Sequence, residues 1–191
     1  MALATSLSRI LGFIRDLLIA QTFGTLAAAQ AFVVAFRLPN LLRDLVAEGA
    51  VSSAFVPVLS WYRVKGRTDD YWSLSHVLLT RLAVCLGLIS IAGVLAAPLI
   101  VRLIAPGFGA DPEKFQLAVG LTRILFPLIF LVGIWAHLTG VLNSLRHFAM
   151  PALGPAIMNV AMIAACLWFV PRAQTGVVAL AVSVMVGGIL Q

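Results

Sequence analysis

Residues 82–101 read LAVCLGLISIAGVLAAPLIV, an uncharged apolar run that sets the fold class. A helix needs about 20 such residues to cross a membrane, because each residue advances it about 1.5 Å through a hydrocarbon layer roughly 30 Å thick. Two further uncharged runs follow at 124–145 and 148–170, and another begins near residue 176. The runs predict several membrane-crossing helices joined by short loops.

Composition supports the same fold class. The chain is 62% hydrophobic and only 10% charged, and its mean hydropathy is +1.07. Soluble domains carry about 25% charged residues, so an ordinary soluble domain is excluded. We therefore expect an all-α, polytopic helical membrane protein with about six transmembrane helices and no soluble catalytic domain. The expected spans lie near 2–23, 29–62, 76–104, 115–145, 148–170 and 176–191.

The distribution of basic residues predicts an orientation. Basic side chains gather in the loop 63–70 and again at 146–147, whereas the loop 105–114 is acidic on balance. The positive-inside rule places the basic loops, and with them the N-terminus, in the cytoplasm, although Arg172 falls on the opposite side. The net charge of +6 is scattered over spans and loops. It therefore does not indicate nucleic-acid binding, which needs basic residues clustered on one face.

The first two expected helices carry ionisable residues inside apolar sequence. The residues are Arg9, Arg15, Asp16, Arg37, Arg43, Asp44 and Glu48. Each costs roughly 2.5–3.5 kcal/mol at membrane depth on the mildest scale, so such groups usually line a polar cavity. Four arginines against three acids leave a positive surplus. Because guanidinium groups stay charged and bind phosphate through two N–H groups at once, the surplus predicts a cavity for an anionic cargo.

Helical spacing divides these residues between faces. One stripe of the second helix holds Gln30, Arg37, Asp44 and Glu48. Arg43 lies well round from that stripe, while Asp44 is placed to pair with Arg37. In the first helix Arg9 and Asp16 share a face, and Arg15 points elsewhere.

Two other roles compete with a cavity role for these arginines. Arginines near helix ends extend to the lipid headgroups, and intramembrane ion pairs can hold helices together. For Arg15 and Arg37, which lie deeper in their helices, we favour the cavity. For Arg43 and Arg123 both interpretations stay open.

Several other residues have structural interpretations. His137, between Gly133 and Gly140, is expected to be a hydrogen-bonded group in helix packing rather than a proton relay. Cys85 and Cys166 are expected to be small buried hydrophobic residues. Three prolines are expected to kink their helices: Pro127, Pro151 and Pro155.

No pattern typical of an enzyme is present in the sequence. A membrane prenyltransferase needs acidic clusters that hold a diphosphate through metal ions, whereas Asp69–Asp70 is a single pair in a loop. There is no Ser/His/Asp group, no metal-ligand cluster and no glycine-rich phosphate loop. We therefore predict no catalytic residues, no metal site and no cofactor.

Longer stretches of sequence resemble a known family. These are SRILGFIRD (8–16), AFVVAFRLPNLLRDLVAEGAVSSAFVPVL (31–59), LAAPLIVRLIAPGF (95–108), LTRILFPLIFL (121–131) and GVLNSLRHFAMPALGPAIMNVAMI (140–163). They are similar to the opening part of the MurJ (MviN-type) lipid II flippases, which belong to the multidrug/oligosaccharidyl-lipid/polysaccharide exporter superfamily. The resemblance covers essentially the whole chain.

The resemblance implies a multi-pass protein of the bacterial inner membrane. Its members move undecaprenyl-diphosphate-linked peptidoglycan precursor from the cytoplasmic to the periplasmic leaflet, through a cationic cavity between two helical lobes that opens alternately to either side. Arg9, Arg15 and Arg43 match the family's cavity arginines and are expected to bind the diphosphate and headgroup. A second group of candidates for the cavity or gate comprises Gln30, Arg37, Asp44, Glu48 and Arg123.

The chain departs from the family in two ways. Gln30 stands where the family commonly has an aspartate, which removes one acid. The chain is also expected to be a fragment of the N-terminal lobe, so that the C-terminal lobe needed for alternating access is missing. Two alternatives are an exporter of another lipid-linked oligosaccharide and a non-transporting membrane scaffold in which the charges hold helices together. A drug antiporter is disfavoured, because the arginine surplus argues against a cationic drug as cargo.

Overall fold

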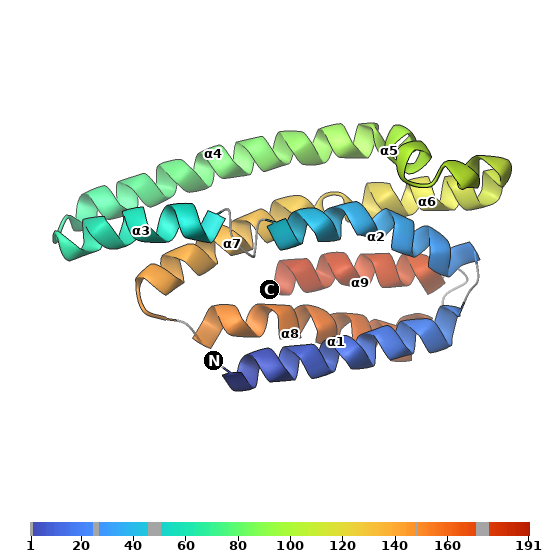
Figure 1. Ribbon diagram of the computed structural model, residues 1–191, viewed down its shortest axis with the longest axis horizontal. Helices are drawn as coiled ribbons and strands as arrows, with labels where there is room; N and C mark the ends of the chain where they lie inside the picture. The colour runs from blue at the N-terminus through green and yellow to red at the C-terminus, as the bar shows by residue number, and fades with distance from the viewer. Residues whose placement is uncertain (1, 25–26, 46–50, 148, 171–175) are drawn as a thin grey trace.

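The computed structural model describes residues 2–24, 27–45, 51–147, 149–170 and 176–191. Within these residues the chain is helical and forms elongated, roughly parallel layers (Figure 1). The α-helices are α1 (Ala2–Phe23), α2 (Ala27–Leu45), α3 (Val51–Val64), α4 (Thr68–Leu95), α5 (Ala97–Ile104), α6 (Pro112–Leu125), α7 (Leu128–Ser144), α8 (Ala149–Ala164) and α9 (Gly176–Leu190). A 3₁₀ turn (Pro106–Ala110) precedes α6, and a π turn (Ala165–Phe169) follows α8.

Helices that are far apart in the sequence pack side by side. α1 lies along α8, and α2 lies along α6 (Figure 1). α3 and α4 pack on α7, while α9 lies between α8 and the α2–α6 pair. In contrast, α1 and α2, which are neighbours in the sequence, make few contacts with each other. This arrangement leaves the space between α1 and α2 open to form a site.

The helix boundaries follow local sequence signals. Asp111 caps α6, because its side-chain oxygen Oδ1 accepts a hydrogen bond from the Lys114 backbone N–H at 3.1 Å, and Pro112 occupies the first helical position. Gly24 ends α1 with a φ of 52°, a conformation that glycine adopts without steric cost. The expected break at Pro127 is confirmed, since α6 ends at Leu125 and α7 begins at Leu128.

The other two prolines do not end their helix. Pro155 lies inside α8, which the structure assigns as continuous. Pro151 lies in the first turn of the same helix, where the missing N–H of proline has no intrahelical partner to lose. Of the three prolines expected to kink a helix, Pro127 thus interrupts the helix assignment, whereas Pro151 and Pro155 do not.

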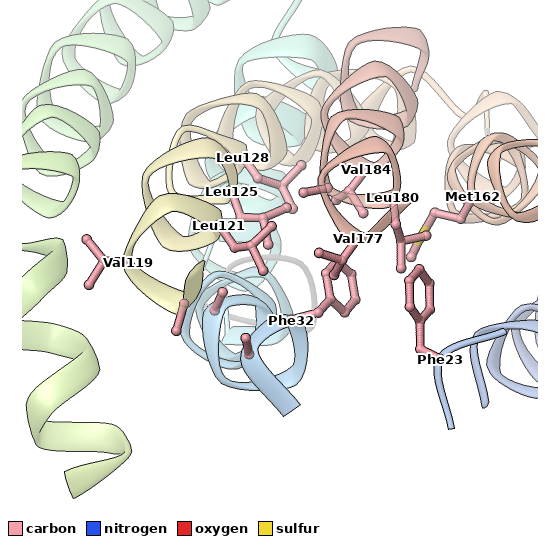
Figure 2. Close-up of a cluster of buried hydrophobic side chains, with 14 of the residues drawn as sticks. Phe23, Phe32, Val119, Leu121, Leu125, Leu128, Met162, Val177, Leu180 and Val184 are labelled. Atoms are coloured by element: carbon pink, nitrogen blue, oxygen red, sulfur yellow. The ribbon is translucent and has the colours of Figure 1, made fainter. Parts of the chain in front are cut away.

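The main core forms where α1, α2, α6, α8 and α9 meet (Figure 2). Leu121, Leu125 and Leu128 point from α6 and the start of α7 towards α9, which contributes Leu180 and Val184. All five side chains are fully buried or nearly so. Truncating one such leucine to alanine typically costs about 2–5 kcal/mol, so these contacts hold α6 and the start of α7 against α9.

Three helical stretches of the described chain are long and apolar enough to cross a membrane: Thr68–Leu95, Pro112–Ser144 and Met150–Trp168. Gly176–Leu190 is a shorter apolar helix. At 22 residues α1 has the length of a span, but it carries Arg9, Arg15 and Asp16. The expected span 29–62 corresponds to α2 and α3, with residues 46–50 between them outside the described residues.

The expectation that both cysteines are buried is wrong for one of them. Cys166 is buried, but Cys85 is exposed on α4. Only 17% of the apolar window of Thr68–Leu95 is buried against the rest of the protein. Most of this helix is therefore not packed against other described parts of the chain, and Cys85 lies on its unpacked side.

Polar side chains connect α3, α4 and α7 at one end of the molecule. The Tyr71 hydroxyl lies 2.7 Å from Ser144 Oγ, and Ser75 Oγ lies 3.2 Å from His137 Nε2. Arg63 donates to the Ser144 carbonyl near the C-terminal end of α7, where backbone carbonyls lack helical partners. The buried His137 thus has the helix-packing environment that the sequence predicted.

Candidate functional site: a groove between α1 and α2

A groove of about 450 Å³ lies between α1 and α2. α1 contributes Arg15, Asp16 and Ile19, and Met162 of α8 also lines it. α2 contributes Phe32, Val33, Phe36, Arg37, Asn40 and Leu41. One wall is therefore a polar patch on α1, and the other combines aromatic and polar side chains on α2.

The α2 wall follows from helical periodicity. Its six lining residues recur at intervals of one, three and four positions, which places them on one side of a helix. Phe32 and Phe36 stack with ring centroids 5.6 Å apart and an interplanar angle of 17°. α2 also packs on α6, and Phe32 belongs to both the main core and the groove lining.

Arg15 is hydrogen-bonded to side chains on two helices. Its Nε and Nη2 groups donate to Asp16 Oδ1 at 2.9 and 2.8 Å, and its Nη1 group donates to Asn159 Oδ1 at 2.8 Å. The Arg15 side chain is 19% exposed, whereas that of Asp16 is 66% exposed. Arg15 is thus held at the groove wall by a carboxylate and an amide that come from two different helices.

These contacts leave Arg15 able to bind an anion. A guanidinium has five N–H donors, and the hydrogen bonds found among the described residues use three of them. Arg37 lines the same groove and is exposed. Among the described lining residues, two guanidinium groups therefore face one carboxylate, Asp16. The described lining therefore carries a positive charge that can attract a phosphate group.

The structure brings only some of the predicted residues together. Arg15, Arg37 and Asp16 line the groove, whereas Arg9 is exposed on α1 and is not among the described lining residues. The expected separation of Arg15 from Asp16 is wrong. Although neighbours on a helix point about 100° apart, the long arginine side chain turns back to reach the carboxylate.

Arg123, for which both interpretations stayed open, lies in the last turn of α6. Its side chain is exposed and lies outside the groove lining that the structure describes. The side chains of Arg43 and Asp44, and all of Glu48, lie outside the described residues.

Gln30 lies at the start of α2 and connects it to α6. Its Oε1 accepts a hydrogen bond from Lys114 Nζ, and the same ammonium lies 4.2 Å from the ring centroid of Phe108. An amide oxygen here accepts from the lysine without adding a charge. Gln30, where the resemblance led us to expect an acid, thus makes a polar contact between α2 and α6.

Asn159 is a groove-associated residue that the sequence interpretation missed. It lies on α8, 144 positions from Arg15, and is 7% exposed. The sequence does contain a signal for this residue, because Asn159 is the single side-chain amide in the apolar run 148–170. Polar groups inside membrane helices commonly mark contacts between helices, so the residue could have been singled out, although its partner could not.

Comparison with known proteins identifies the family. The family model described as lipid II flippase MurJ matches residues 19–191. The chain belongs to the lipid II flippase MurJ family. The expected resemblance is thereby confirmed, as is the expected fold of a helical membrane protein.

Individual MurJ relatives agree over the whole chain. The lipid II flippase MurJ of Burkholderia cenocepacia is 43% identical over 187 residues, which cover 98% of this chain and 36% of the relative. A probable lipid II flippase MurJ of Rhizobium tropici is 42% identical over 192 residues, with coverage of 98% and 36%. The chain thus spans little more than a third of the length of these relatives.

A solved structure supports the arrangement of the helices. Lipid II flippase MurJ in an inward closed conformation superposes with a TM-score of 0.82 and 30% sequence identity. The match covers 99% of this chain and 39% of that structure. The packing of α1 on α8 and of α2 on α6 therefore belongs to a fold that a solved MurJ shares.

Proposed function

We propose that the protein flips lipid II, the undecaprenyl-diphosphate-linked peptidoglycan precursor, from the cytoplasmic to the periplasmic leaflet. The observation that carries the proposal is the groove between α1 and α2, where Arg15 and Arg37 face one described carboxylate. Membership of the MurJ family supports lipid II as the cargo. The proposed activity is transport rather than catalysis.

The groove suggests how the substrate is bound. Arg15 and Arg37 bind the diphosphate, which carries the negative charge of the lipid. Each hydrogen bond from a charged donor contributes about 1.5–3 kcal/mol. The hydrogen bonds from Arg15 to a phosphate therefore offset part of the free energy that the phosphate loses with its hydration. Arg9, Arg43 and Glu48 remain proposed contributors to the headgroup site or its gate. The groove is then one wall of a larger cavity.

We also propose the topology. Residues 1–191 form the N-terminal lobe, with about six spans, of a two-lobed transporter in the bacterial inner membrane. The α3–α4 and α7–α8 connections, which carry the basic loop residues, lie at the same end of the molecule (Figure 1). The positive-inside rule supports a cytoplasmic location for this end and for the N-terminus.

A chimaera tests the function. In it, this chain replaces the matching 187-residue segment of the Burkholderia cenocepacia flippase, in cells depleted of their own flippase. We expect the chimaera to restore exposure of the lipid II headgroup at the outer leaflet, measured with a headgroup-cleaving enzyme added outside the cytoplasmic membrane. Arg15→Ala should abolish most of this exposure, because the groove loses a guanidinium proposed to bind the diphosphate.

Arg81→Ala is the matched control, because Arg81 is an exposed arginine on α4, outside the described groove lining. It should leave headgroup exposure within about twofold of the unsubstituted chimaera, as expected for a surface substitution. A well-inserted chimaera that leaves lipid II wholly on the cytoplasmic side would contradict the proposed function. Equal export by the Arg15→Ala and Arg81→Ala chimaeras would contradict the proposed site and favour a scaffold role for the charges.

A further inference from the structure

We propose that Asn159 is a positioning residue that holds the Arg15 guanidinium in the orientation needed to bind a diphosphate. The inference rests on the proposed function. Its basis is a pair of hydrogen bonds from one side chain: Oδ1 accepts from Arg15 Nη1 at 2.8 Å, and Nδ2 donates to the Ser8 carbonyl at 3.1 Å. Asn159 thus binds both the side chain and the backbone of α1.

The burial of Asn159 shows that these contacts are specific. The residue is 7% exposed and stands in an apolar stretch of α8. A buried amide without partners costs about 1–3 kcal/mol, so it persists where both its donor and its acceptor are satisfied. α1 supplies both partners from one face, since Ser8, Gly12 and Arg15 are spaced four and three residues apart.

Gly12 lies next to the Asn159 amide. A Cβ added at Gly12 would lie 3.6 Å from Asn159 Nδ2, so the amide packs against the helix surface at ordinary contact distance. The Ser8 carbonyl and the Arg15 guanidinium lie on either side of this contact along α1. The amide therefore bridges two points of α1 about two turns apart and fixes the helix, as well as the arginine, against α8.

The two partners of Arg15 together define the direction of its free donors. Asp16 accepts hydrogen bonds from the Nε–H and from one N–H of Nη2, while Asn159 accepts one from an N–H of Nη1. One N–H on each Nη remains beyond these described contacts, a pair suited to two oxygens of one phosphate. A side chain held in this way loses little conformational freedom when it binds, which is the benefit of preorganisation.

The test is a double-mutant cycle on the purified chimaera, with lipid II in detergent as the probe. Asn159→Leu removes both hydrogen bonds at similar size, and Arg15→Ala removes the proposed phosphate contact. We expect Asn159→Leu to weaken lipid II binding about tenfold, roughly the effect of losing one charged hydrogen bond. In the Arg15→Ala background, Asn159→Leu should have no further effect. Ser183→Ala, which removes a buried hydroxyl bonded within α9, should leave binding unchanged.

The background dependence separates positioning from mere packing. Equal weakening by Asn159→Leu with and without Arg15 would overturn the inference, and so would unchanged binding by the Asn159→Leu protein. If Arg15→Ala leaves binding intact while the protein is folded, the proposed diphosphate site fails as well. Should Asn159→Leu not yield folded protein, Asn159→Ser takes its place in the cycle, because its polar side chain is too short to reach Nη1. The same binding outcomes then support or overturn the inference.

Discussion

At the scale of single residues, the two groove arginines differ in how they are held. Arg15 is fixed by Asp16 and Asn159, whereas Arg37 lies exposed on the opposite wall. A fixed guanidinium offers geometry as well as charge, because its planar fork meets two acceptors at once. An exposed arginine such as Arg37 adds mainly its charge to phosphate binding, and salt screens that contribution.

Replacing each arginine by lysine tests this difference. Lysine keeps the charge but loses the planar fork, so Arg15→Lys cannot satisfy Asp16, Asn159 and a phosphate together. We expect Arg15→Lys to lower lipid II binding by the chimaera about tenfold or more, the loss of one charged hydrogen bond or more. Arg37→Lys should lower it less than about threefold, because its role is mainly charge. Direct titration with lipid II measures both; a larger loss at Arg37 than at Arg15 would refute the assignment.

At the scale of helices, close packing depends on positions without a side chain. α4 approaches the end of α6 at Gly93, where an added Cβ would lie 1.8 Å from the Phe126 ring. Phe126 is buried and immediately precedes the Pro127 break. Gly93 therefore sets how closely α4 covers the junction between α6 and α7.

Gly93→Ala should destabilise the protein through this contact. Overpacking a filled interior typically costs about 1–3 kcal/mol, so we expect a lower thermal midpoint for the purified chain in detergent. Gly87→Ala on the same helix is the control, since nothing lies within 4 Å of an added Cβ there. It should be neutral or stabilising by up to about 1 kcal/mol, because alanine restricts the unfolded chain. Similar midpoints for the two variants would show that Phe126 moves aside without cost.

At the scale of the whole molecule, we propose that the groove is one wall of a larger cavity. The chain spans 36% of its Burkholderia cenocepacia relative. The groove lies between α1 and α2, which make few contacts with each other. Alternating access needs a second body that moves against the first. The remaining two thirds of the relative contain the sequence from which such a body would come.

A split flippase tests this dependence. Expressed alone in depleted cells, the chain should insert into the membrane but leave lipid II on the cytoplasmic side. Co-expressed with the remaining segment of the Burkholderia cenocepacia protein, it should restore exposure of the headgroup at the outer leaflet. Headgroup cleavage from outside measures both, with the Arg15→Ala chain plus the same segment as control. Full activity of the chain alone would rule out the need for a second lobe.

The amino-acid order was enough to predict the membrane class, the helical fold and the family. Hydropathy is a local property, so the length of a run such as 82–101 indicates a span without knowledge of its neighbours. The break at Pro127 follows equally from chemistry within the chain. Arg15 and Arg37 were recognised as cavity candidates because a charge in apolar sequence is costly wherever the helix lies.

Only the tertiary structure assigned partners and faces. Asn159 and Arg15 meet across 144 positions, Asp16 pairs with Arg15, and Cys85 faces outwards. Periodicity within one helix defines which residues share a side, but not which helix or lipid that side meets. The partner of each face depends on how all the helices pack together, including α1 on α8 and α2 on α6.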